Sequence, residues 1–207
     1  SNNIHQYYNP VFKGGISTIT KQTVNNSSRK ILFPTISGKR WYVCMQKPFK
    51  LHPCFGNMLQ KVLDKDDEGI IILHAGAERN WGLDMSRVYY LNSLPHHELL
   101  ALYREADVVL DSYYAGGCTT TREAFEMGAV VVTLPAKYLG GRWTKAYYDI
   151  LGVSDAIAKD EDDYAKLAVS IACNPSLKAS ISSKISENIH KMWRSEEAVN
   201  NLSLIHI

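Results

Sequence analysis

The sequence predicts an α/β protein with a Rossmann-like parallel sheet and helices on both faces. Short apolar runs of strand length alternate with longer stretches in which apolar residues recur at helical spacing. Within 106–135, reading ADVVLDSYYAGGCTTTREAFEMGAVVVTLP, a strand, a glycine-bearing loop, a helix start and a second strand follow one another directly. Ligands of such sheets bind beyond the carboxyl ends of the strands, near the reversal of strand order.

The elements before residue 106 follow from apolar runs and helical periodicity. Near-continuous apolar runs predict strands that are buried on both faces. In order, we expect a strand over 41–45, a helix over about 53–63, a strand over 69–74, a strand over 87–91, and a helix that starts at Ser93 and Pro95 and carries Leu99, Leu100, Leu102 and Tyr103.

The elements after residue 106 are delimited by glycines and prolines. Glycine after the last periodic residue is typical of a helix C-terminus, and Pro is favoured in the first turn. In order, we expect a strand over 106–112, a helix from Cys118 to a cap at Gly128, a strand over 129–134, a helix from Trp143 to Leu151 ended by Gly152, a short strand near 155–158, a helix carrying Tyr164 to Ile171, and a last helix from Asn174 and Pro175.

Composition indicates a globular protein of ordinary size. The 207 residues are 45% hydrophobic and 21% charged, and the net charge of +2 gives no field that favours nucleic acid or a membrane surface as partner. The four cysteines are scattered, without the paired spacing of a zinc site, which favours a reducing compartment. No apolar stretch is long enough to span a bilayer, and no signal peptide opens the chain.

The chain divides into three parts. Residues 1–38 are polar and rich in Asn, Ser and Thr, as expected of a linker or the tail of a preceding unit. Residues 39–201 form the predicted domain. Residues 202–207, LSLIHI, resemble a translated sequencing adapter and are interpreted as a non-native scar.

The glycine loop at Gly116 and Gly117 predicts an anion site. The first turn of the following helix has unpaired backbone N–H groups and the positive end of the helix dipole, and it carries three threonine hydroxyls, from Thr119 to Thr121. A phosphate or diphosphate fits there. Glu123, one turn further, can accept hydrogen bonds from a ribose, although the spacing from Thr120 to Glu123 is equally that of a capping box without a ligand.

Three loops at strand ends carry a family resemblance. GGCTTTREAFEMG, KPFKLHP and SLPHH together resemble the carboxyl-terminal catalytic half of the O-linked N-acetylglucosamine transferases, which are family 41 glycosyltransferases of the GT-B fold. The resemblance covers about 41–201. It implies the carboxyl-terminal half of a GT-B enzyme, with an amino-terminal half that this chain lacks.

The resemblance assigns the phosphate side of the site. Thr119 and Thr120, with Gly117 and Cys118 before them, would bind the diphosphate, and Glu123 would hold the ribose in place of the family's aspartate. Lys50 would stabilise the departing nucleotide where charge develops, although a lysine at a helix start could equally be a solvated residue without a ligand. It is therefore the catalytic candidate in this chain, and the general base is expected in the missing half. Lys47 stands where the family has glutamine and is a further candidate contact.

The resemblance also assigns the base side. Leu94 would offer backbone groups to the base, with His96 alongside, although His96 and His97 could equally be exposed helix-start residues. Arg142 matches the family without a defined role. Cys118 stands in place of the family's histidine, and Leu99 in place of a histidine that stacks on uracil.

The function implied is a nucleotide-sugar-binding half, with UDP-N-acetylglucosamine as donor, of an inverting transferase that acts on Ser or Thr of proteins. Such an enzyme would work in the cytoplasm or nucleocytoplasm without a cofactor or metal, and its partners would be the sugar donor, a protein acceptor and the missing half. The alternatives are a nucleotide-sugar epimerase of GT-B shape and a non-catalytic binding relic.

Two other patterns are interpreted as structural. Asp64 and Asp66 have the spacing of a metal-binding DxD motif, but they lie in the charge run DKDDE before a strand, which favours a solvated loop. Cys118 is at a helix start, where a thiol is activated, but no His or Asp lies near it in sequence, which favours a packing or ligand-lining role.

Overall fold

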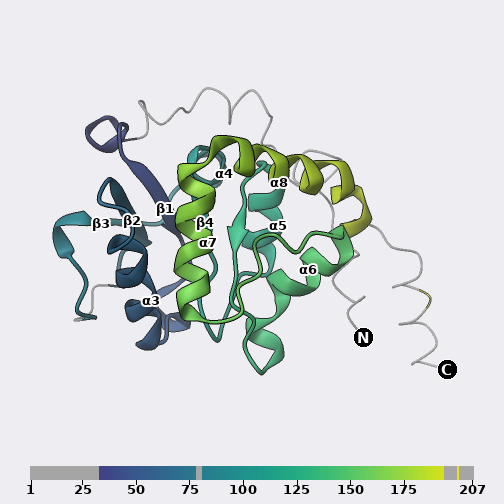
Figure 1. The fold of residues 1–207 in the computed structure, drawn as a ribbon, viewed down its shortest axis with the longest axis horizontal. Helices are drawn as coiled ribbons and strands as arrows, with labels where there is room; N and C mark the ends of the chain where they lie inside the picture. The colour runs from purple at the N-terminus through teal and green to yellow at the C-terminus, as the bar shows by residue number, and fades with distance from the viewer. Residues whose placement is uncertain (1–32, 78–80, 194–199, 201–207) are drawn as a thin grey trace.

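A computed structural model describes residues 33–77, 81–193 and 200. Its sheet has five parallel strands in the order β3-β2-β1-β4-β5 (Figure 1). The strands are β1 (Arg40–Cys44), β2 (Gly69–His74), β3 (Val88–Leu91), β4 (Val108–Leu110) and β5 (Val131–Val132). The helices are α3 (Cys54–Leu63), α4 (His96–Glu105), α5 (Thr119–Glu126), α6 (Trp143–Leu151), α7 (Glu161–Cys173) and α8 (Pro175–Asn188). The predicted α/β class is confirmed.

The helices cover both faces of the sheet because the strand order reverses at β1. The chain moves from β1 to β2 through α3, and then in the opposite direction through α4 to β4 and through α5 to β5. Right-handed crossovers that run in opposite directions lie on opposite faces. Accordingly, α7 packs beside α3 and crosses in front of the strands in Figure 1, whereas α4 packs against α5. The reversal falls between β1 and β4.

The strands are apolar along their whole length because they are covered on both faces. All residues of β4 and β5 are buried, as are four of five in β1 and five of six in β2. The largest fully buried side chains in the described part of the chain come from strands and helices alike: Trp41, Tyr42, Phe55, Tyr103, Tyr148 and Tyr164. This continuous core fixes the strand ends that carry the loops.

Helix ends follow the predicted signals. Gly128 and Gly152 have φ of 75° and 69°, the left-handed conformation that glycine adopts without strain at a helix C-terminus. The side chain of Asn174 accepts a hydrogen bond from the Leu177 amide, and Pro175 occupies the first turn of α8. These residues set where α5, α6 and α8 begin or end.

Some elements differ from the sequence prediction. β5 has two residues only, and the strand expected near 155–158 is a single bridge between Thr133 and Ile157. Of the connection from β2 to β3, residues 75–77 and 81–87 contain no α-helix, so the alternation of strands and helices is interrupted there. Phe33 and Ile36, within the stretch expected to be a linker, pack against the core. Residues 1–32 and the expected scar, 202–207, lie outside the described residues.

The interpretation of Asp66 as part of a solvated loop is wrong. Asp66 is 4% exposed and accepts hydrogen bonds from Arg40 and from the Tyr42 hydroxyl, at 2.7 Å in the latter case. Burial alone would raise the pKa of Asp66, but the hydrogen bonds from Arg40 and Tyr42 outweigh it, so the pKa lies below its ordinary value. This ion pair joins β1 to the turn before β2, at the opposite edge of the sheet from the candidate site.

Within the described residues, no helix combines the length and the apolar character that a membrane span requires.

Candidate functional site

The loops that carry the predicted site residues meet at the carboxyl edge of the sheet. Residues 45–53 follow β1, residues 92–95 follow β3 and residues 111–118 follow β4. β1 and β4 are the neighbouring strands between which the strand order reverses, and this is where sheets of this type bind ligands. The positions predicted from the sequence are therefore brought together by the fold.

The carboxylate of Asp111 fixes the glycine turn by hydrogen bonds. It accepts the Gly117 amide at 2.7 Å and the Thr133 hydroxyl at 2.8 Å. Burial raises the pKa of Asp111, against hydrogen bonds from Gly117, Thr144 and Thr133 that favour the ionised form. Because its amide is already donated to Asp111, Gly117 shapes the turn and does not offer that N–H to a ligand.

The turn leaves little room for a side chain at position 117. A Cβ there would collide with the Thr121 hydroxyl and lie 2.9 Å from Thr120 Oγ1 and 3.0 Å from Gln46 Nε2. The φ of Gly117 is not positive, so this requirement comes from close packing alone. The glycine lets three polar side chains approach one point at the start of α5.

The start of α5 leaves backbone donors without acceptors. Cys118 is the N-cap residue and makes no side-chain cap hydrogen bond. The amides of Thr119, Thr120 and Thr121 have no protein acceptor in the described part of the chain. Such amides, with the helix dipole behind them, favour an anion.

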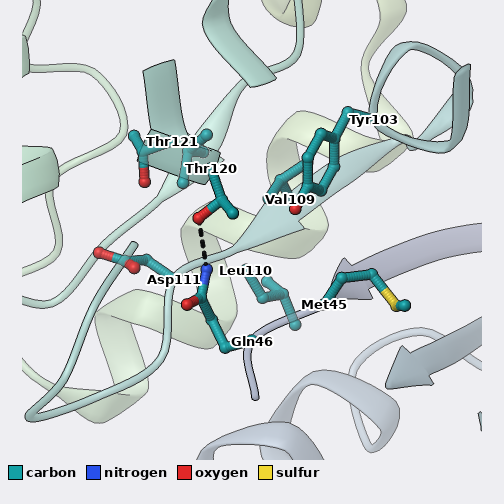
Figure 2. A pocket seen from close by; sticks show the side chains of 9 residues that line it. Met45, Gln46, Tyr103, Val109, Leu110, Asp111, Thr120 and Thr121 are labelled. Atoms are coloured by element: carbon teal, nitrogen blue, oxygen red, sulfur yellow. Dashed lines mark hydrogen bonds between the residues drawn. The ribbon is translucent and has the colours of Figure 1, made fainter. Parts of the chain in front are cut away.

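Lys50 is linked to this helix start through Gln46. Its ammonium group donates to Gln46 Oε1 at 3.0 Å and to the Gly116 carbonyl at 3.3 Å, and both acceptors are neutral. Gln46 Nε2 in turn donates to Thr120 Oγ1 at 2.8 Å (Figure 2). A chain of contacts thus runs from Lys50 through Gln46 to α5, and Lys50 forms no salt bridge with a carboxylate of the described residues.

The space enclosed beneath these side chains is small. A cavity of about 10 Å³ is lined by the polar side chains of Gln46, Asp111, Thr120 and Thr121 and by apolar side chains beside them (Figure 2). This is roughly the volume that one water molecule needs. The enclosed space is therefore too small for a diphosphate.

The capping box, the alternative role for Glu123, is not formed. Cys118 and not Thr120 is the N-cap, and the hydroxyl of Thr120 is bonded to Gln46. Glu123 Oε1 instead accepts a hydrogen bond from His96 Nε2 at 2.9 Å. The structure therefore joins two residues to which the sequence gave separate roles, Glu123 in a helix for the ribose and His96 at a helix start for the base.

Lys47 lies apart from the phosphate side. Its ammonium group is 3.1 Å from His74 Nε2 and 3.2 Å from Ser93 Oγ. His74 ends β2, and Ser93 directly precedes Leu94 in the loop expected to read a base. The structure thus places Lys47 beside the base-side loop and not beside Lys50.

The remaining predicted residues have protein partners. Cys118 Sγ is 3.2 Å from the Tyr147 hydroxyl, and the Arg142 guanidinium donates to the Ala136 carbonyl at 3.1 Å. Among the described residues, no three His, Cys, Asp or Glu side chains gather closely enough to hold a metal ion.

Sequence reasoning missed two residues that hold the site together. Gln46 is 8% exposed and bridges Lys50 and Thr120, and Asp111 fixes the glycine turn. Asp111 directly follows β4, which ends at residue 110, and Gln46 lies two residues after the end of β1 at residue 44. A polar residue at that position, where a side chain should point to the carboxyl edge, is the signal that could have identified both.

Comparisons with known proteins agree with this architecture. Residues 65–197 match the family model described as Glycosyl transferase family 41. A UDP-N-acetylglucosamine--peptide N-acetylglucosaminyltransferase of Caenorhabditis elegans is 27% identical over 147 residues, which cover 66% of this chain and 13% of that relative. The chain therefore corresponds to a small part of the relative's length.

Solved glycosyltransferase structures share the fold. An O-GlcNAc transferase mutant of Thermobaculum terrenum superposes with a TM-score of 0.70 at 22% identity, over 82% of this chain and 35% of that one. A UDP-forming α,α-trehalose-phosphate synthase of Burkholderia xenovorans gives 0.63 at 11% identity, over 90% and 48% of the two chains. The chain has the Rossmann-like unit of these GT-B enzymes.

Proposed function

Because the chain belongs to glycosyl transferase family 41, we propose that its carboxyl-edge site binds the diphosphate of a nucleotide-sugar donor. The chain would then be the donor-binding part of an inverting transferase that glycosylates Ser or Thr of proteins. The observation that carries this proposal is the ammonium group of Lys50, which hydrogen-bonds only neutral groups and is joined through Gln46 to Thr120, beside the open amides at the start of α5.

The donor is proposed from the relatives. The Caenorhabditis elegans relative is named for UDP-N-acetylglucosamine and a peptide acceptor, and we propose the same donor and acceptor class here. Glu123 Oε2 makes no hydrogen bond in the described part of the chain and would accept the hydroxyls of the ribose. Leu94 and Lys47, on the base-side loop or beside it, would contact the base. The four unpaired cysteines fit the proposed cytoplasmic or nucleocytoplasmic location.

The chemistry proposed for this chain is stabilisation of the leaving group. When the acceptor oxygen attacks the anomeric carbon, the bond from that carbon to the diphosphate breaks, and its electron pair remains on the departing phosphate oxygen. Lys50 and the amides at the start of α5 would stabilise that negative charge, because donors that are oriented before the reaction need no rearrangement as the charge develops. The base that takes the acceptor's proton would come from the part of the enzyme outside this chain.

Calorimetry tests the proposal with UDP and other nucleoside diphosphates. We expect the parent chain to bind UDP and Lys50→Gln to bind it at least tenfold more weakly, since a hydrogen bond to a charged group contributes about 1.5–3 kcal/mol. Lys184→Gln is the matched control, because Lys184 pairs with Asp155 on another part of the surface. A folded parent that binds no nucleoside diphosphate, or equal affinity in Lys50→Gln and the parent, would refute the proposal.

A further inference from the structure

Glu123 is buried, and only one of its two carboxylate oxygens has a hydrogen-bond partner in the described part of the chain. The residue is 7% exposed and lies in the second turn of α5. Its Oε1 is 2.9 Å from His96 Nε2, whereas Oε2 has no hydrogen-bond partner in the described part of the chain. His96, the first residue of α4, has a side chain that is 42% exposed, so the pair lies at the surface end of the site.

His96 is the group that can hold this carboxylate. Arg122 directs its guanidinium to the ring of Tyr147, with 5.6 Å between them, and Tyr103 approaches from α4 without a hydrogen bond to Glu123. Burial raises the pKa of Glu123, and the nearby Arg122 and the hydrogen-bonded His96 oppose that rise. A buried carboxylate that loses its donor takes up a proton in preference to remaining charged.

We propose that His96 is a positioning residue for ribose recognition: it fixes Glu123 through Oε1, so that Oε2 stays ionised and open to the two hydroxyls of a ribonucleotide. This rests on the proposed function, because it concerns the same donor. It goes further in one respect, since it makes the affinity for the ribose portion depend on the contact between His96 and Glu123 and on the ionisation of Glu123.

The sign of the pH dependence follows from the carboxylate. An ionised carboxylate accepts both ribose O–H groups, and a protonated one has lost part of that capacity. Affinity for a ribonucleotide should therefore fall as the pH falls through the pKa of Glu123. Without His96 that pKa would lie higher, and the loss of affinity would begin at a higher pH.

Calorimetric titrations with UDP between pH 5 and pH 8 test this, with inorganic pyrophosphate as the probe that lacks a ribose. The terminal phosphate of the ligand titrates in the same range in every variant and cancels from the differences. We expect His96→Ala to weaken UDP about tenfold at pH 7 and to shift the acid limb to higher pH, with pyrophosphate binding unchanged. His96→Lys, which can still donate an N–H to Glu123, should restore parental affinity.

Two further variants isolate the pair. His97→Ala is the matched control, because His97 stands at the same helix start and lies 4.0 Å from Glu98, not near Glu123. In a Glu123→Gln background, His96→Ala should have no further effect on UDP affinity.

The outcomes separate this inference from the proposed function. A parent chain that binds UDP with the same pH profile as His96→Ala would overturn the role of His96 alone. Equal weakening of UDP and pyrophosphate by His96→Ala would overturn it as well, because a general structural effect would then be the cause. A parent that binds neither ligand would overturn the proposed function and this inference together.

Discussion

Replacing Gly117 by alanine tests whether the glycine turn sets the geometry of the site. The added Cβ would meet the hydroxyls of Thr121 and Thr120 and the amide nitrogen of Gln46. Since φ at this position is not positive, the penalty is one of overpacking, about 1–3 kcal/mol in a tightly packed region. The three polar groups must also move apart, which displaces the helix start from Lys50.

Urea unfolding and UDP calorimetry measure the two effects. We expect Gly117→Ala to lower the free energy of unfolding by about 1–2 kcal/mol, because the loss of unfolded-state entropy offsets part of the clash. UDP affinity should fall about tenfold or more, which corresponds to about 1.4 kcal/mol. Gly38→Ala is the control, since a Cβ at position 38 meets nothing within 4 Å. Equal stability and affinity in the two variants would refute the packing argument.

Three further predictions concern the supporting structure. Gly152→Ala should lower the free energy of unfolding by about 1–2 kcal/mol in urea, because a left-handed φ of 69° strains any residue with a Cβ; an unchanged midpoint would contradict this. Asp66→Asn should lower stability at pH 7 by about 3 kcal/mol, because it breaks the pair with Arg40. Folding lowers the pKa of Asp66, so the stability that ionised Asp66 contributes is present above the unfolded pKa and is lost as the pH falls through the folded pKa. The free energy of unfolding of Asp66→Asn should therefore lack this loss in acid. Parallel pH profiles of the parent and the variant would show the reasoning to be wrong. Gln46→Leu should weaken both UDP and pyrophosphate by separating Lys50 from Thr120, and retention of parental affinity for both would argue against the bridge.

The sequence predicted the parts of the fold that depend on local patterns. The run GIIILH is β2 to the residue, and Gly128, Gly152 and Asn174 end or begin helices as expected. The family resemblance is confirmed by the family match over 65–197, which contains the loops SLPHH and GGCTTTREAFEMG, whereas KPFKLHP lies before the matched range. β5 has two residues only, although the whole run 129–133 is buried, because beyond Val132 the pairing is reduced to one bridge from Thr133 to Ile157.

The side-chain partnerships of the site could not be read from local patterns. His96 and Glu123 are 27 residues apart, and Gln46 and Thr120 are 74 apart, so only the packing of α4 on α5 and of β1 beside β4 brings them together. Asp66 is a second residue whose partners could not be predicted from its neighbours in the sequence. Its charged neighbours in sequence indicated a solvated loop, whereas Arg40 and Tyr42 from β1 bury it. Lys50 and its position remain the part of the site on which the proposed chemistry depends.

A titration of the ¹⁵N-labelled chain with UDP, followed by NMR, tests that dependence most directly. The amides of Thr119, Thr120 and Thr121 should show the largest shifts. The start of α8, where Asn174 already caps the Leu177 amide, should remain unchanged. In Lys50→Gln the same amides should respond only at much higher UDP concentrations. Shifts that avoid the start of α5, or that are equal in the parent and in Lys50→Gln, would contradict the account.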